Sequence, residues 1–245
     1  MFIKPAVLNK TAHQKLRFQA VSGFSYASKS HAVPICLAEF YLAAKEYPIV
    51  FVKNKDDEIF PVVVTGLTEG ENLFVVNDAS WNAHYVPAAV RSYPYAFAEQ
   101  KNSESVVLID EAYSGFGEIN GIALFNDEGE IASELKDRLK FLQDHENQIQ
   151  LTRKFVQHIR GLDLLIERTA QFLPNEKTAF QVNGCWIIDE AKLYALGDEE
   201  LLKLTRQGYI ALVTAHLLSL SNFTDLMKKL DRNQNFAKQP SSEKP

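Results

Sequence analysis

The hydrophobic pattern of this 245-residue chain changes near residue 130. Before that point, short runs rich in β-branched and aromatic residues are bounded by Gly, Asn and Asp, which is typical of strands. Two of them, 49–53 and 60–65, flank a charged turn and predict an antiparallel hairpin. Pro61 fits a strand start or an edge position. Further strands are predicted at 72–77, 105–110 and 121–126.

A helical period appears once in the first half, from Pro34 to Tyr47, where apolar residues recur every three or four positions. After residue 130 this period dominates. It predicts helices over 133–172, with a break near Gln148–Leu151, because Thr152 is a suitable N-cap. Two more helices are expected, from Asp198 to Gly208 and from Tyr209 to about Leu230.

One hairpin signal interrupts the helical half. Asn183-Gly184 lies between two β-prone runs within 178–189, and this dipeptide favours the positive φ angles of a tight two-residue turn. The chain is therefore predicted to be α+β, with a mainly antiparallel, β-rich N-terminal half and a helical C-terminal half that contains a β-hairpin.

The domain prediction follows the same boundary. Residues 1–130 form a β-rich aromatic half and residues 131–230 a mainly helical half; whether the two share one core stays open at this point. The polar residues 231–245 are expected to be a disordered tail.

Charge and composition narrow the function classes. The chain carries a formal net charge of −5, and no run of four or more Lys or Arg occurs, so a nucleic-acid partner is not expected. The most apolar late segment, 210–220, is shorter than the roughly 20 residues of a membrane span, and no secretory signal opens the chain. A cytoplasmic protein is expected, with non-classical export to the surface as the alternative. Cys36 and Cys185 suit buried thiols in a reducing compartment.

Searches for catalytic chemistry yield little. The chain has no phosphate-binding loop, no dinucleotide-binding glycine pattern and no nucleophile elbow. None of its six His begins a His-x-Asp/Glu motif, so no metal and no cofactor is predicted, although a site assembled from distant residues would escape such a search. His216 lies on an apolar helical face, which favours a buried core histidine.

The segment 81–97 concentrates rigid side chains: one Trp, three Tyr and one Phe, with two Pro, a His and an Arg. Arg91 could clamp a carboxylate or phosphate while its guanidinium stacks on a Tyr ring. In the competing interpretation the rings cover the sheet and Arg91 pairs with an acidic neighbour. Because aromatic clusters are common core material, the pattern favours the competing interpretation.

These residues also carry a family resemblance. The run Tyr-x-Pro-Ala-x-x-Arg-x-Tyr-Pro at 85–94 is specific in combination, and the chain resembles the bacterial SapC family over roughly residues 30–225. Ser80 stands where that family usually has glycine before Trp81. The other matching stretches are Pro34-Ile-Cys-Leu-Ala-Glu-Phe40, Tyr47-Pro-Ile-Val-Phe51, Asn72-Leu-Phe74, Leu124-Phe125, Thr152 with Phe155, and 182–193.

The resemblance implies a surface-layer-associated binding or accessory protein that acts on a peptide, protein or surface polymer, and it supplies no catalytic residues. Its candidate binding surface consists of Trp81, Tyr85, Arg91, Tyr93 and Tyr95.

The alternative is an enzyme, or a partner of enzymes such as halogenases and iron oxygenases. The resemblance suggests this because genes of family members look like companions of genes for those enzymes. The enzyme site would assemble from separated residues, and the secondary candidates are His31, Glu39 and His84, together with Arg91. The sequence leaves the oligomeric state undetermined.

Overall fold

The computed structural model describes residues 1–20, 22–76, 79–99, 105–172 and 180–238. Its helices are α1 (Lys10–His13), α2 (Phe40–Ala43), α3 (Ala88–Arg91), α4 (Ser133–Gly161), α5 (Glu190–Tyr194), α6 (Asp198–Arg206), α7 (Tyr209–Ser219) and α8 (Phe223–Lys238). Within the described residues, the short 3₁₀ turns are η1 (Ser25–Ala27), η2 (Leu37–Glu39) and η4 (Leu220–Asn222).

The main sheet combines strands from both halves of the chain. It has five antiparallel strands in the order β10-β11-β4-β5-β3, so the predicted α+β class is confirmed. The predicted hairpin is also confirmed, as β4 pairs with β5 from Ile49 opposite Val63 to Lys53 opposite Ile59. The five strands are β3 (Ala32–Pro34), β4 (Ile49–Lys53), β5 (Ile59–Val64), β10 (Leu165–Phe172) and β11 (Phe180–Ile188).

Two smaller sheets lie in the N-terminal half, in the orders β1-β7-β6 and β8-β2-β9. A second hydrophobic cluster, which includes Phe18, Tyr95, Ile109 and Leu124, packs between them and the start of α4. The strands are β1 (Pro5–Val7), β2 (Arg17–Phe18), β6 (Tyr95–Glu99), β7 (Ser105–Asp110), β8 (Phe116–Gly117) and β9 (Ile122–Ala123).

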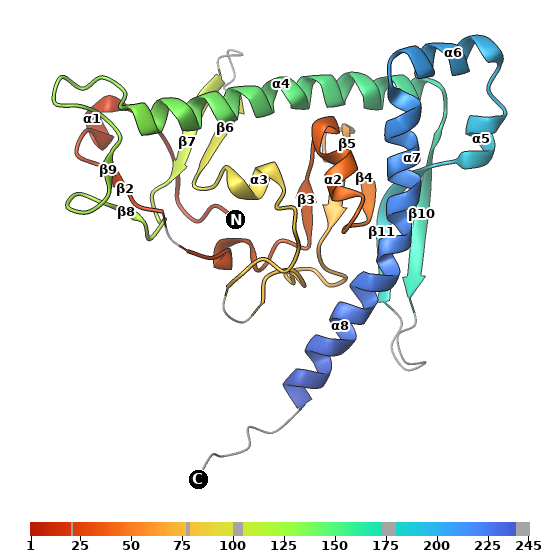
Figure 1. Cartoon of the computed structure of the whole chain (residues 1–245), viewed down its shortest axis with the longest axis horizontal. Helices are drawn as coiled ribbons and strands as arrows, with labels where there is room; N and C mark the ends of the chain where they lie inside the picture. Colours follow the sequence, from red (N-terminus) through yellow and green to blue (C-terminus); the bar gives the residue numbers. More distant parts are fainter. Residues whose placement is uncertain (21, 77–78, 100–104, 173–179, 239–245) are drawn as a thin grey trace.

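Helix α4 connects the two hydrophobic clusters. It is one unbroken helix of 29 residues that runs along the top of the molecule from the region of α1 and β9 to α7 (Figure 1). Leu135 and Leu142 are buried in the smaller cluster, whereas Phe155 and Ile159 are buried in the larger one beside the main sheet. A shared helix couples the two packing regions mechanically, because neither can shift without disturbing it.

The predicted break near Gln148–Leu151 is wrong. The Thr152 hydroxyl donates to the carbonyl of Gln148, one turn earlier, at 2.7 Å and accepts from the N–H of Leu37 at 2.9 Å. Thr152 thus satisfies its hydroxyl inside the helix while fastening η2 to α4, a tertiary role that local capping preferences do not reveal.

The end of the range 133–172, which was predicted to be helical, is not a helix. α4 ends at Gly161, and residues 165–172 form strand β10. The hairpin predicted within 178–189 is wrong, because Phe180–Ile188 form the single strand β11; the hairpin of the C-terminal half pairs β11 with β10 instead. β11 runs through Asn183-Gly184, and Gly184 has φ 69° where the register shifts between Arg168 and Ala170. The dipeptide therefore forms a β-bulge, which uses the same positive φ as a turn.

Two further predictions fail in the N-terminal half. The helix expected from Pro34 to Tyr47 is reduced to η2 and α2, because Pro34 belongs to β3. The strand expected at 72–77 is absent from the described part, 72–76, which holds a single bridge between Val75 and Trp81. The predicted strand at 121–126 shortens to β9.

The last helices follow one another without a loop, so that α7, η4 and α8 form one continuous helical segment from Tyr209, which bends between α7 and α8 (Figure 1). The stretch Tyr209–Arg232 is long and apolar enough to cross a membrane by length and composition alone, as the core helix of a soluble protein also can be, and 33% of its apolar 18-residue part is buried inside the protein. His216 in α7 is fully buried against the main sheet. The absence of a membrane span stays a prediction. α8 continues to Lys238, past the boundary predicted for a disordered tail.

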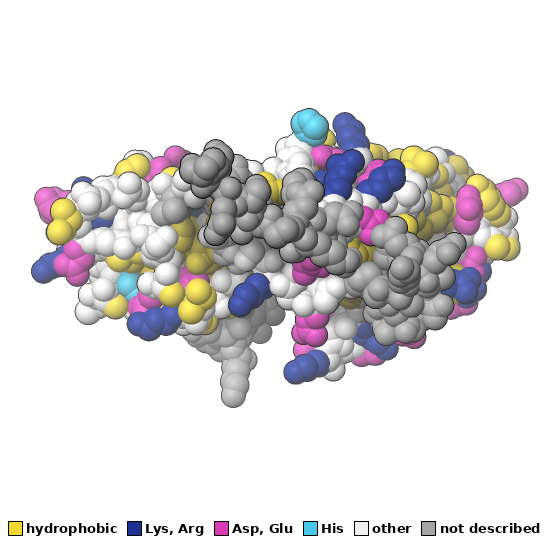
Figure 2. Space-filling model, turned by 90° about the horizontal axis from the view of Figure 1, so that it is seen from below, with side chains coloured by type: hydrophobic (Ala, Val, Ile, Leu, Met, Phe, Trp, Pro, Cys, Tyr) yellow, Lys and Arg dark blue, Asp and Glu magenta, His cyan; other side chains and the backbone are white. Residues whose placement is uncertain are grey.

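Figure 2 shows the face seen from below, where Lys and Arg side chains are interspersed with Asp and Glu. Mixed charge of this kind differs from the single-sign stripe of a typical duplex-DNA-binding surface.

Candidate functional site

A pocket of about 430 Å³ opens beneath α4, where three segments far apart in the sequence meet. The segments are η2 with its N-cap, the stretch 85–91 that ends in α3, and the middle of α4. We call it the α4 pocket. It is lined by Cys36, Ala38, Glu39, Leu42, Tyr85, Ala88, Arg91, Phe141, Asp144, His145, Asn147 and Gln148.

Glu39 is the buried carboxylate of this pocket, with 4% of its surface exposed. It forms a capping box with Cys36: its Oε2 accepts from the Cys36 N–H at 2.8 Å, and the Cys36 side chain accepts from the Glu39 N–H. Its Oε1 accepts from the Tyr85 hydroxyl and from the Ala88 N–H, each at 2.8 Å. Three donors therefore stabilise one buried negative charge.

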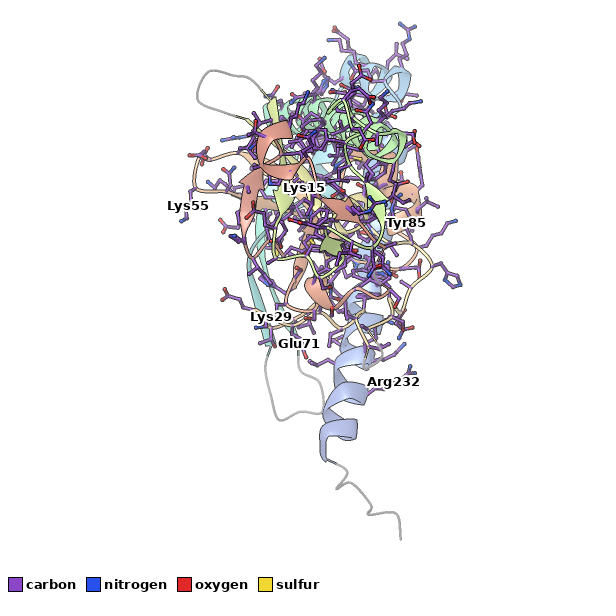
Figure 3. The ribbon with its side chains drawn as sticks, turned by 90° about the vertical axis from the view of Figure 1, so that its left-hand side faces the viewer. Lys15, Lys29, Lys55, Glu71, Tyr85 and Arg232 are labelled. Atoms are coloured by element: carbon purple, nitrogen blue, oxygen red, sulfur yellow. The ribbon has the colours of Figure 1, made fainter. Side chains whose placement is uncertain are left out.

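Tyr85 lies between Glu39 and Arg91. Its hydroxyl donates to Glu39, and burial together with the nearby Glu39 charge raises the pKa of Tyr85. The phenol is thus protonated near neutral pH and acts as a donor. In Figure 3, Tyr85 and Lys55, which lies in the turn between β4 and β5, are on opposite sides of the molecule.

Arg91 is exposed at the end of α3 and is held by its backbone neighbours and two rings. Its Nε donates to the Val86 carbonyl at 2.9 Å. Its guanidinium carbon lies 5.8 Å from the centre of the Tyr85 ring and 5.1 Å from that of Phe141. Among the described residues, no carboxylate forms an ion pair with Arg91. The predicted pairing of Arg91 with an acidic neighbour is therefore not seen there.

The other three candidate aromatic residues lie in the hydrophobic core. Trp81 is 8% exposed, and its Nε1 donates to the Tyr47 hydroxyl at 2.7 Å. The Tyr93 hydroxyl donates to Asp110 at 2.9 Å. Tyr95 is 1% exposed and lines a neighbouring cavity of about 300 Å³, which Arg91 also lines. These rings support the fold, while Tyr85 and Arg91 reach the α4 pocket.

Of the secondary candidates Glu39, His31 and His84, one lines the α4 pocket and two do not. Glu39 lies in the α4 pocket, but neither of the two histidines lines it. His84 is fully exposed, with its Nδ1 3.3 Å from a Glu46 carboxylate oxygen. His31 borders a different cavity, which Cys185 also lines. Of the four residues proposed for an enzyme site, only Glu39 and Arg91 therefore line the same pocket.

Among the pocket residues that the sequence did not name as candidates are the thiol of Cys36 and the imidazole of His145. The Cys36 sulfur, a Glu39 oxygen and a His145 ring nitrogen all lie within 4.8 Å of one another. Two signals could have found them. Cys36 and Glu39 have the three-residue spacing of a capping box, and His145 follows the inward-facing Leu142 by three positions.

The titration behaviour of the two residues follows from burial. Burial, reinforced by the Glu39 charge, raises the pKa of the Cys36 thiol to about 12. Burial lowers the pKa of His145, although the nearby Glu39 charge acts in the opposite direction. Near pH 7 the pocket therefore holds a thiol and a neutral imidazole beside the Glu39 carboxylate.

A comparison with protein families matches the SapC family model to residues 8–226 of the chain. The chain belongs to the SapC family. No curated protein matches it, and no solved structure does. The SapC match includes every residue that lines the α4 pocket. It ends early in α8, so most of that helix lies outside the matched SapC region.

Proposed function

We propose that this SapC-family protein is a non-catalytic binding or accessory protein that holds a carboxylate of a peptide, protein or surface polymer in the α4 pocket. The observation that carries the proposal is the Arg91 guanidinium, held between two rings without an ion-pair partner among the described residues. A planar guanidinium in this setting is suited to bind a carboxylate through two parallel hydrogen bonds.

The surroundings of Arg91 support this ligand class. Phe141 and Tyr85 fix the guanidinium plane, which reduces the entropy lost when a ligand binds. Leu42 and Phe141 supply apolar surface, while Asn147 and Gln148 supply amide groups for the polar part of a peptide. A surface-layer association, which the family resemblance implies, and a cytoplasmic location before any export are parts of the same proposal.

Short peptides with free C-terminal carboxylates, compared with their amidated forms, test this function. We expect the free acids to bind the wild-type protein and the Arg91→Ala variant to lose that binding. Arg160→Ala is the matched control, because Arg160 is exposed on α4 and pairs with Asp57 away from the pocket. Equal binding by wild type and a folded Arg91→Ala variant, across free and amidated peptides, would refute the site.

The enzyme alternative has one observation in its favour. Glu39 and Arg91, both named by the sequence, share the α4 pocket with Cys36 and His145. The raised pKa of Cys36 gives the thiol little thiolate character, so the cluster lacks a ready nucleophile. Turnover of a bound peptide that is lost in Glu39→Gln would favour the enzyme.

A further inference from the structure

Cys36, Glu39 and His145 bring three metal-ligating atoms together at the inner wall of the α4 pocket. One ligand atom from each lies within 4.8 Å of the other two. Cys36 and Glu39 are buried and come from η2 and its N-cap, whereas His145 comes from α4 and is partly accessible, with 15% of its side chain exposed. The cluster thus has two fixed ligands and one that faces the opening.

We propose that the α4 pocket binds one divalent transition-metal ion, of which Zn²⁺ fits the ligand set, through Cys36 Sγ, Glu39 Oε2 and His145 Nε2. A fourth coordination position then faces the pocket and takes water or a carboxylate ligand.

The donor chemistry selects the class of metal. A thiolate, an imidazole and a carboxylate suit Zn²⁺ and neighbouring transition metals, whereas Mg²⁺ and Ca²⁺ require all-oxygen sites. Three protein ligands with an open fourth position are the arrangement of zinc sites that bind an exchangeable group.

The geometry requires only a small closure. Bond lengths of about 2.0–2.3 Å around a tetrahedral ion place the ligand atoms roughly 3.3–3.8 Å apart. The His145 Nε2 lies 4.0 Å from Glu39 Oε2. His145 stacks on Phe141 with an interplanar angle of 10°, so a sliding or tilting motion of its ring against Phe141 brings the nitrogen closer.

Hydrogen bonds around Glu39 prepare one oxygen for the metal. Tyr85 and the Ala88 N–H occupy Oε1, which fixes the carboxylate plane and leaves Oε2 directed toward His145. The Cys36 N–H holds Oε2 beside the cysteine itself. Such surrounding donors orient the ligands of metal sites.

Metal binding displaces one proton. The Cys36 thiol releases its proton to the solvent as the metal–sulfur bond forms, so the affinity for the metal rises with pH. The buried carboxylate then gains a full positive partner at short range.

This proposal does not rest on the carboxylate binding assigned to Arg91. The metal ligands come from Cys36, Glu39 and His145 alone, so metal binding is measured with the metal alone and without any peptide. Loss of peptide binding and loss of metal binding are thereby separate results.

Titration of the metal-free, reduced full-length protein with Co²⁺ alone tests the site. We expect one Co²⁺ per chain, the near-ultraviolet absorption of a cobalt–thiolate bond, the visible bands of four-coordinate cobalt, and loss of both on addition of Zn²⁺. Cys36→Ser should remove the near-ultraviolet band. His145→Gln removes a direct ligand and should weaken Co²⁺ binding by more than the roughly tenfold that loss of an outer-shell partner costs.

Two matched variants serve as controls. Cys185→Ser changes the other buried cysteine, and His158→Gln changes another histidine of α4; neither residue belongs to the cluster. Both should bind Co²⁺ like the wild type. His145 is partly exposed, so its variant tests the site even if Cys36→Ser unfolds. Absence of Co²⁺ binding to the wild type, or a thiolate band that survives in folded Cys36→Ser but not in Cys185→Ser, would overturn the proposal.

Discussion

The Tyr85 hydroxyl donates a 2.8 Å hydrogen bond to the buried carboxylate of Glu39, which lies 46 residues earlier in the chain. This bond joins η2 to the segment that leads into α3, and both segments form one wall of the α4 pocket. The candidate site is thus held together by the same interaction that fixes the local fold.

Tyr85→Phe should destabilise the protein by about 1–2 kcal/mol, because the variant loses a hydrogen bond to a charged acceptor. Urea unfolding of the wild type and the variant measures the difference. Tyr41→Phe is the control, since Tyr41 is 54% exposed, and should change stability little. Equal losses in the two variants would contradict a special role for the bond to Glu39.

Glu39→Ala should lower the free energy of unfolding further, by on the order of 3 kcal/mol. The substitution leaves three donors without their acceptor: the N–H groups of Cys36 and Ala88 and the Tyr85 hydroxyl. Thermal and urea unfolding are the measurements. Glu128→Ala, at an exposed turn, is the matched control. A folded Glu39→Ala variant as stable as that control would show that the carboxylate does not organise the pocket.

Trp81→Phe should cost about 2–3 kcal/mol, because it removes the indole donor to Tyr47 and leaves unfilled volume in the core. Peptide binding by the folded variant should remain, since Trp81 does not line the α4 pocket. Trp186→Phe at a half-buried position is the control for stability. If Trp81→Phe lost peptide binding but kept wild-type stability, Trp81 would belong to the binding surface.

His216 should make the protein acid-sensitive. Burial lowers its pKa from 6.5 to about 4, and its Nε2 accepts from the Ile188 N–H at 3.1 Å, which requires the unprotonated nitrogen. Between these pH values the unfolded chain binds the proton and the folded chain does not. Stability therefore falls as pH decreases from about 6.5 toward about 4, by a total on the order of 3 kcal/mol.

Unfolding free energies at intervals across that pH range check this prediction. His216→Gln is expected to be less stable at pH 7 but to show a shallower decline with acid. His84→Gln is the control, because His84 is exposed, and should retain the wild-type slope. A His216→Gln slope as steep as that of wild type would assign the acid sensitivity to other groups.

The sequence by itself determined the local elements whose pattern was unambiguous. The hairpin of β4 and β5 follows from two runs rich in β-branched and aromatic residues around a charged turn, and the helical character of α4, α6 and α7 follows from apolar spacing. It also predicted the α+β class and the family, because both depend on residue types and their order. Of the five main candidates for a binding surface, Tyr85 and Arg91 line the α4 pocket, and their role there stays a prediction.

Only the tertiary structure decided the roles that depend on long-range partners. Asn183-Gly184 permits a turn or a bulge equally, and the pairing of β10 with β11 selects the bulge. Thr152 could cap a helix, but its contact with Leu37 keeps it inside α4. Cys36 and His145 meet because α4 packs on η2, across 109 residues of chain. No local propensity encodes such a meeting, since it arises from burying both hydrophobic clusters under one helix.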